Sequence, residues 1–364
     1  MAKTELNEAS VLQALSSVQE PVLKKDFVSL DAVRDLNIKG SEVSLRLVLI
    51  APMHPFSEQI EEKVREAILG IEGVKSVKLT LDAEVPADGR QRAGSAAQVR
   101  NVVAVASGKG GVGKSTVAVN TAVALAQAGA RVGLLDADIY GPNVPTMMGV
   151  DRLPQPPDEE GHLVPAEAHG VKLMSIGFLV NPQQAMVWRG PMLHNAIRQF
   201  IEDVEWGELD YLIIDLPPGT GDVQLSLAQN TPLSGGVIVT LPQKVSVDDA
   251  RRGIEMFRQM RILIMGVVEN MSYLPMPDGK NMDIFGSGGG KELADEVGAP
   301  YIGNIPIDPA VRVGGDDGVP IVLSHPNSVA AAAFRTVAAD LALKASLAAL
   351  ASQSEAIPIT MVDE

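Results

Sequence analysis

Residues 108–116 read Gly-Lys-Gly-Gly-Val-Gly-Lys-Ser-Thr, which is the spacing of a phosphate-binding loop. Its glycines let the backbone fold tightly enough for successive N–H groups to point at phosphate oxygens. We expect Lys114 to reach the β- and γ-phosphates of ATP, and the Ser115 hydroxyl to ligate Mg²⁺. The predicted nucleotide-binding residues of this loop are Gly108, Lys109, Gly110, Gly111, Val112, Gly113, Lys114, Ser115 and Thr116.

The segments on either side of the loop agree with this interpretation. Residues 99–106 are apolar and rich in valine, which is typical of a buried parallel strand. Residues 116–129 are rich in alanine and end at a glycine, as a helix does. A chance glycine-rich turn would not need a strand before it and a helix after it, whereas a phosphate-binding loop does.

Three aspartates follow apolar runs and are expected at the carboxyl ends of strands, where open α/β sheets bind ligands. We expect Asp138 to orient the attacking water and Asp136 to be a structural or outer-shell partner of the metal. The pair could instead cap or solvate a loop, a common role of aspartate. Asp215 follows residues 211–214 and is expected to hold Mg²⁺ through water. The predicted catalytic set is Lys109, Lys114 and Asp138, and the predicted metal set is Ser115, Asp136 and Asp215.

A base-binding region is expected from residues near two later strands. Asn270 follows the run 262–268, and its amide can both donate to and accept from an adenine edge. Asparagine at a strand end is more often a turn former, so this alternative stays open. Pro306 and Asp308 follow the last expected strand and could close over the same base.

From residue 99 onward, short apolar runs alternate with helical stretches, which predicts an α/β fold with a doubly wound, mostly parallel sheet. The expected strands are 102–106, 132–136, 171–176, 211–215, 236–241, 262–268 and 301–305, and an alanine-rich helix is expected at 328–352. Residues 1–86 predict a small α+β domain in the order helix, strand, strand, helix, strand. Residues 87–98 are small and polar and predict a flexible linker, which leaves 99–364 as the P-loop domain.

Composition narrows the possible partners of this 364-residue chain. Its net charge of −15 argues against nonspecific nucleic-acid binding, which needs clustered lysine and arginine. No apolar run reaches the length of a membrane span, and the first residues lack the layout of a signal peptide, so we expect a cytoplasmic protein that binds no membrane. With no cysteine, the chain offers no disulfide and no thiolate ligand for an iron–sulfur cluster.

Lys109 makes the loop a two-lysine, deviant form, which resembles the dimeric ATPases that include MinD, ParA and the nitrogenase iron protein. The chain from Val99 to about Ala342 closely resembles one branch of them, the Mrp/ApbC iron–sulfur carrier ATPases, and the N-terminal part resembles an iron–sulfur assembly domain. The motifs that carry the resemblance are 108–116, 136–145 (DADIYGPNVP), 188–192 (WRGPM), 215–222 (DLPPGTGD), 269–272 (ENMS) and 284–290 (IFGSGGG). The resemblance implies a homodimer that hydrolyses ATP slowly, with Lys109 reaching the partner's nucleotide. It also implies a bridging [4Fe–4S] cluster that is passed to apoprotein clients.

In one segment this chain departs from the family pattern. The family carries Cys-x-x-Cys between the ENMS and FGxGGG motifs, whereas residues 273–283 here read YLPMPDGKNMD. The uncharged thioethers of Met276 and Met282 are poor replacements for thiolates. The sequence thus leaves open a cluster held by unusual ligands, a cluster-free ATP-dependent adaptor, a positioning protein like MinD or ParA, and a metabolic P-loop kinase or ligase.

Overall fold

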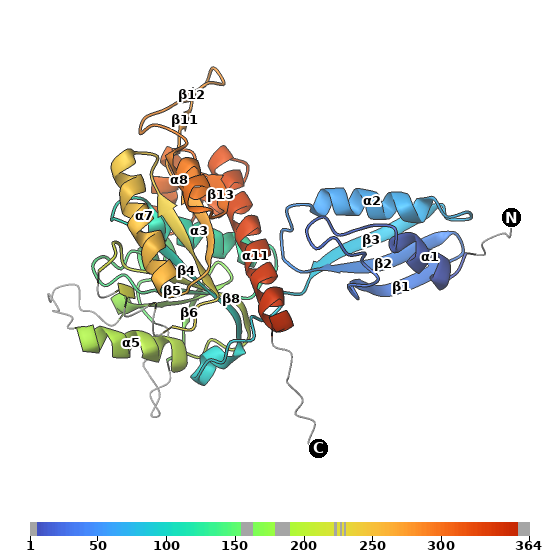
Figure 1. Ribbon diagram of the computed structural model, residues 1–364, viewed down its shortest axis with the longest axis horizontal. Coiled ribbons are helices and arrows are strands. Elements are labelled where there is room, and N and C mark those ends of the chain that lie inside the picture. The colour runs from blue at the N-terminus through green and yellow to red at the C-terminus, as the bar shows by residue number, and fades with distance from the viewer. Residues whose placement is uncertain are drawn as a thin grey trace. The chain divides into compact units, whose positions relative to one another are not determined.

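The structure is a computed structural model, which describes residues 6–153, 163–178, 190–221, 224–225, 228 and 231–355. The chain divides into two compact units, Met1–Val85 and Pro86–Glu364 (Figure 1). Of the sequence motifs named above, Trp188, Arg189 and Asp222 lie outside the described residues.

The small unit follows the element order expected from the sequence. Its elements are α1 (Glu8–Leu15), β1 (Val33–Lys39), β2 (Glu42–Leu49), α2 (Ser57–Leu69) and β3 (Ser76–Ala83). The sheet has the order β1-β2-β3, with β2 antiparallel to β1 and parallel to β3. Alternate residues of β2, including Val43 and Leu47, are buried together with Ile60 and Val64 of α2. The alternation that predicted β2 therefore reflects a sheet with one face covered by helices.

The large unit is built on an eight-stranded sheet with the order β13-β10-β9-β4-β8-β5-β7-β6. Its strands are β4 (Val99–Ser107), β5 (Val132–Asp136), β6 (Ala166–Ala168), β7 (Val171–Ser175), β8 (Leu209–Asp215), β9 (Gly235–Thr240), β10 (Ile264–Glu269) and β13 (Tyr301–Asn304). All neighbouring pairs are parallel except β6 with β7. The predicted doubly wound, mostly parallel sheet is confirmed, and the short antiparallel edge strand β6 is an addition to it.

Helices cover both faces of this sheet. They are α3 (Lys114–Gln127), α4 (Val144–Met147), α5 (Gly190–Glu202), α7 (Lys244–Gln259), α8 (Gly289–Val297), α9 (Pro309–Asp316), α10 (Ile321–Ser324) and α11 (Val329–Glu355). α5, α7 and α8 share one apolar core with Val102 and Ala104 of β4. Val103 and Val105 point to the other face, on the side of α3 and α11, which contact each other and β4. Among the described residues, no helix combines the length and the apolar character needed to cross a bilayer.

The segment 87–98 differs from the flexible linker that its composition predicts. The buried side chain of Arg92 pairs with Asp88, with Nη2 and Oδ2 2.5 Å apart, and Ser234 Oγ donates to the same carboxylate. Residues Gly94–Gln98 form a 3₁₀ helix, and Ser352 Oγ of α11 donates to the Asp88 carbonyl. The polar residues that suggested flexibility are instead bonded to distant parts of the large unit.

A buried histidine and glutamate, His54 and Glu20, face each other in the small unit. His54 Nε2 is 3.3 Å from Glu20 Oε1, and both side chains are almost fully buried. Glu20 also accepts hydrogen bonds from the backbone N–H groups of Val22 and Leu23. The N–H of Phe56 donates to His54 Nδ1, so the neutral imidazole carries its proton on Nε2, facing Glu20. Burial lowers the pKa of His54 from its ordinary 6.5, against the opposing charge of Glu20.

We predict that the small unit loses stability on acidification below pH 6.5, the ordinary pKa of histidine. The folded state keeps His54 neutral while the unfolded chain takes up a proton below pH 6.5, so the free energy of unfolding falls as the pH drops below this value and is unaffected by His54 above it. His54→Gln should remove this dependence, because glutamine is close to histidine in size and does not titrate. The measurement is hydrogen exchange of the β2 amides across pH 5 to 8, corrected for intrinsic rates.

His325→Gln is the matched control, since His325 is an exposed histidine of the large unit. Equal acid sensitivity of the β2 amides in the wild type and in His54→Gln would contradict the assignment to His54.

Candidate nucleotide-binding site

The glycine loop connects β4 to α3 and depends on glycine at defined positions. Gly111 and Gly113 have φ angles of +79° and +80°, a region that other residues rarely adopt. A Cβ at Gly113 would lie 2.1 Å from Asn270 Nδ2, and one at Gly108 would lie 2.1 Å from the backbone of Asp249. The loop is therefore held in a left-handed, closely packed conformation, and α3 begins directly after it at Lys114.

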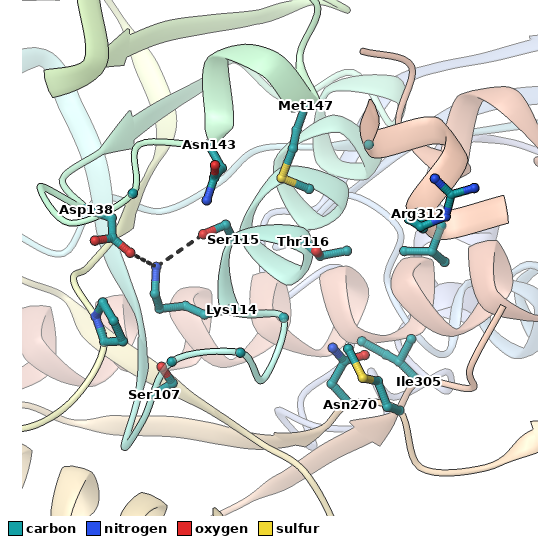
Figure 2. Close-up of a pocket in the computed structure, with 18 of the residues that line it drawn as sticks. Ser107, Lys114, Ser115, Thr116, Asp138, Asn143, Met147, Asn270, Ile305 and Arg312 are labelled. Atoms are coloured by element: carbon teal, nitrogen blue, oxygen red, sulfur yellow. Dashed lines mark hydrogen bonds and ion pairs between the residues drawn. The ribbon is translucent and has the colours of Figure 1, made fainter. Parts of the chain in front are cut away.

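Beside this loop lies a cavity of about 790 Å³ (Figure 2). It is lined by residues of the loop, of the segment after β5, and of the segment between β13 and α9. Of the predicted site residues, those that line it are Lys109, Gly110, Gly111, Gly113, Lys114, Ser115, Thr116, Asp138, Asn270, Pro306 and Asp308. Gly108 packs against α7, Val112 is buried, and Asp136 and Asp215 are fully buried behind the wall.

Lys114 lies at the centre of a buried set of charges. Its Nζ is 2.6 Å from Asp215 Oδ1, 3.6 Å from Asp138 Oδ2 and 3.3 Å from Ser115 Oγ (Figure 2 shows the last two). Ser115 Oγ also donates to Asp215 Oδ2 at 2.5 Å. A buried ammonium needs such partners, because an unpaired charge in the interior is strongly unfavourable. Phosphate oxygens bound at this end of the cavity would compete with Asp215 for Lys114.

Asp136 is fully buried and does not line the cavity. Its carboxylate accepts hydrogen bonds from the N–H of Asp138 (3.1 Å), the N–H of Val144 (3.3 Å) and Ser175 Oγ (2.9 Å). Burial, and next the charge of Asp215, raise the pKa of Asp136 to about 7. Asp136 was expected to be either a structural residue or an outer-shell partner of the metal. Its contacts fit the structural role, since Asp136 fixes both ends of the loop that carries Asp138. Its membership of the metal set stays a prediction.

Asp138 and Lys109 face the cavity. Asp138 Oδ1 accepts from the N–H of Tyr140 at 3.1 Å, and burial raises the pKa of Asp138 although Lys114 opposes this. Lys109 is half-buried, and within the described parts of the chain its ammonium makes no ion pair. Both side chains are therefore available to groups bound in the cavity.

The residues expected to contact the adenine base, Asn270 and Asp308, also line the cavity. Asn270 Nδ2 donates to the carbonyl of Val112 at 2.8 Å, so this amide nitrogen holds the loop and Oδ1 remains as an acceptor. Asp308 lines the cavity and also caps α9, accepting from the N–H of Ala310 at 2.9 Å. Sequence reasoning did not single out the lining residues Met147, Asn143, Val311 and Arg312. Asn143 lies within the motif 136–145 but was given no role there, whereas the other three belong to short helices with no motif of their own.

The strand, glycine loop and helix, with Lys114, Ser115 and the buried Asp215 beside them, define a nucleotide-binding P-loop protein. Two family models match this chain, an iron-transfer P-loop NTPase (NUBPL) over residues 98–342 and an iron-sulfur cluster assembly protein over residues 8–81. The chain therefore belongs to the iron-transfer P-loop NTPase family. This confirms the family expected from the sequence.

Relatives match over almost the whole chain. The chain is 50% identical to an iron-sulfur cluster carrier protein of Synechocystis, covering 95% of this chain and 99% of the relative. It is 40% identical to an iron-sulfur cluster carrier protein of Escherichia coli K12, covering 96% and 94%. Both units are thus shared with these relatives.

Solved structures agree on the fold of the large unit. A nucleotide-binding protein of Archaeoglobus fulgidus in complex with ADP is 39% identical, with a TM-score of 0.54, covering 61% of this chain and 87% of that one. The cell division ATPase MinD of Pyrococcus furiosus is 23% identical, with a TM-score of 0.51, covering 66% and 98%. The likeness to MinD shows a shared fold alone and gives no support to a positioning function.

We predict that Asp215→Asn binds ADP more tightly than the wild type when magnesium is removed. The substitution frees Lys114 from a charge-assisted hydrogen bond and removes a negative charge near the phosphates. Because such a bond contributes about 1.5 kcal/mol or more, the gain should be about tenfold. Calorimetric titration of ADP with a chelator, and again with Mg²⁺, measures it, and the gain on adding Mg²⁺ should shrink.

Asp138→Asn is the matched control, because it removes the same charge at 3.6 Å instead of 2.6 Å from Lys114. It should change the magnesium-free affinity less. An unchanged ADP affinity in Asp215→Asn would show that Asp215 does not compete for Lys114.

Proposed function

We propose that this chain is an ATPase of iron–sulfur cluster assembly that acts as a homodimer and serves apoprotein clients. The observation that carries the proposal is the cluster of Lys114, Ser115, Asp138 and Asp215 at one end of the 790 Å³ cavity. Relatives that match both units are named iron-sulfur cluster carrier proteins, which supports the choice of pathway.

The reaction that fits this cavity is attack of water on the γ-phosphate of ATP. The new bond joins the water oxygen to the γ-phosphorus, and the bond to the β–γ bridging oxygen breaks, which releases ADP and phosphate. The loop N–H groups and Lys114 offset the negative charge that develops, and Asp138 accepts a hydrogen bond from the water and orients it. Ser115, and Asp215 through water, would hold Mg²⁺, which neutralises phosphate charge when bound.

Lys109 supplies a further cation in the proposed homodimer. Its side chain lines the cavity, and in the described residues no carboxylate neutralises it. Across a two-fold interface, Lys109 of each chain would reach the nucleotide of the other. A cation supplied in this way stabilises the transition state only when the two chains are together, so hydrolysis would be tied to assembly.

An iron–sulfur cluster is cargo in this proposal, and the chain does not provide the usual ligands for it. There is no cysteine in the sequence, and the described residues contain no group of three or more histidine, aspartate or glutamate side chains placed to hold a metal ion. The thioethers of Met276 and Met282 carry no charge to balance iron. The residues therefore do not fit a cluster held by this chain alone, and thiolates from another molecule would have to complete it.

We predict that Lys109→Ala binds ATP with nearly unchanged affinity but hydrolyses it about a thousandfold more slowly, as expected for a transition-state cation supplied in trans. The variant should also form less dimer in the presence of ATP. Steady-state phosphate release, calorimetric ATP binding and sedimentation velocity measure the three quantities.

Lys78→Ala is the control, because it removes an exposed lysine from β3 of the small unit. It should leave all three quantities unchanged. Normal turnover in Lys109→Ala would rule out a catalytic part for this lysine.

The place of the protein in iron–sulfur assembly is tested by anaerobic reconstitution with iron and sulfide, with and without glutathione. Because the chain lacks thiolates, we expect a stable cluster absorption band only when the external thiol is present. Metal and sulfide analysis checks the composition. Iron retained without the thiol would contradict the inference that this chain alone cannot hold a cluster. Absence of ATP hydrolysis by the protein would contradict the proposal that it is an ATPase. Hydrolysis without iron under either condition would point to the cluster-free adaptor.

A further inference from the structure

Two consecutive residues at the end of β10 point to different functional regions. Asn270 contacts the glycine loop, as described above, while the side chain of Glu269 contacts the segment that follows. That segment, residues 273–288, contains the two short strands β11 (Leu274–Pro275) and β12 (Asn281–Met282) and is called the β11–β12 excursion here. Figure 1 shows it standing away from the sheet.

The carboxylate of Glu269 fixes both ends of the β11–β12 excursion. Its Oε1 accepts hydrogen bonds from Ser272 Oγ at 2.5 Å, where the excursion begins, and from the N–H of Gly288 at 3.0 Å, where it ends. Its Oε2 accepts from the N–H of Gly290 at 2.6 Å. Glu269 is completely buried, so these three donors replace the water that would otherwise solvate its charge.

The glycines after the excursion allow this close approach. A Cβ at Gly290 would lie 2.9 Å from Glu269 Cβ, and one at Gly289 would lie 2.4 Å from the Pro242 carbonyl oxygen. Gly288 has a φ angle of +82° and precedes the first turn of α8. The negative charge of Glu269 thus lies at the amino end of a helix, where the helix dipole favours it. The end of the excursion and the start of α8 are held by one side chain.

Backbone hydrogen bonds connect the same residues to the cavity wall. The N–H of Ile305 donates to the Glu269 carbonyl at 2.9 Å, and the N–H of Ser272 donates to the Ile305 carbonyl at 2.9 Å. The N–H of Ile307 donates to the Tyr273 carbonyl at 2.7 Å. Because Ile305 and Ile307 line the cavity, the wall that would contact the base is bonded to the chain that enters the excursion.

We propose that Glu269 is a positioning residue that transmits nucleotide binding to the β11–β12 excursion. A nucleotide that orders the glycine loop and residues 305–307 restrains Asn270 and the strand end. Glu269 then passes the restraint to both ends of the excursion at once. The excursion stands away from the sheet (Figure 1), so its position would determine how a partner meets this protein. The proposal rests on the nucleotide binding proposed above.

The test compares hydrogen exchange of the full chain with and without MgADP, in the wild type and in Glu269→Gln. Glutamine keeps the size of the side chain but turns an –NH₂ group toward backbone N–H donors. In the wild type, MgADP should slow exchange in both 108–116 and 273–288. In Glu269→Gln, the loop should still be protected, while the nucleotide-dependent slowing in the excursion should fall by about tenfold, a typical size for coupling between sites.

Glu292→Gln is the matched control, since Glu292 is an exposed carboxylate in the first turn of α8. It should behave as the wild type. If Glu269→Gln does not fold, Ser272→Ala removes a single donor to the carboxylate and should weaken the coupling in part. If MgADP slows exchange in the wild-type loop but not in the wild-type excursion, the proposed coupling is wrong while the nucleotide site stands. No protection of the loop would instead contradict the proposed nucleotide site.

Discussion

The buried contact between Lys114 and Asp215 joins the two strands on which the site depends. β4 leads into the glycine loop and β8 ends at Asp215, and the register places Val105 of β4 opposite Asp215. Asp136 is in turn the register partner of Asp215 on the next strand, which is why their charges interact. A parallel sheet brings the carboxyl ends of these strands to one edge. The buried Lys114 ammonium offsets the negative charge of the buried aspartates there, which would otherwise destabilise the folded state. The loop that carries Asp138 is then placed by Asp136.

Local signals were sufficient to predict much of this arrangement. The glycine loop, the flanking strand and helix, and the aspartates at strand ends are each recorded in a few adjacent residues. The segment 87–98 could not be predicted in this way, because the partners of Arg92 and Asp88 are Pro232, Ser234 and Ser352, far along the chain. Strand β6 was missed because three residues carry too little periodicity. The second role of Asp308, as the cap of α9, likewise depends on where the helix starts.

ATP hydrolysis and iron–sulfur cluster binding, the two parts of the proposed function, are not equally supported by the side chains present. The side chains that would bind and hydrolyse ATP are all present and lie together. The sequence has no cysteine that could bind iron, and residues 273–283 offer only the thioethers of Met276 and Met282 and polar side chains. The residues proposed for ATP hydrolysis would therefore not need a bound cluster, and the first activity could persist without the second. What connects the two regions is the hydrogen-bonded path through the end of β10.

The contacts of the segment 87–92 also constrain the order in which the large unit can be completed during synthesis. Its first residues are bonded to its last helix, since Gln353 Nε2 donates to the Ala87 carbonyl at 2.7 Å and Ser352 Oγ to that of Asp88. β4, the first strand made, lies between β8 and β9. The small unit ends at Val85 and can fold as soon as it leaves the ribosome, whereas the large unit must wait for α11. A ribosome that stalls shortly before residue 352 therefore leaves a finished small unit attached to a large unit that still lacks the contacts of its last helix with residues 87 and 88.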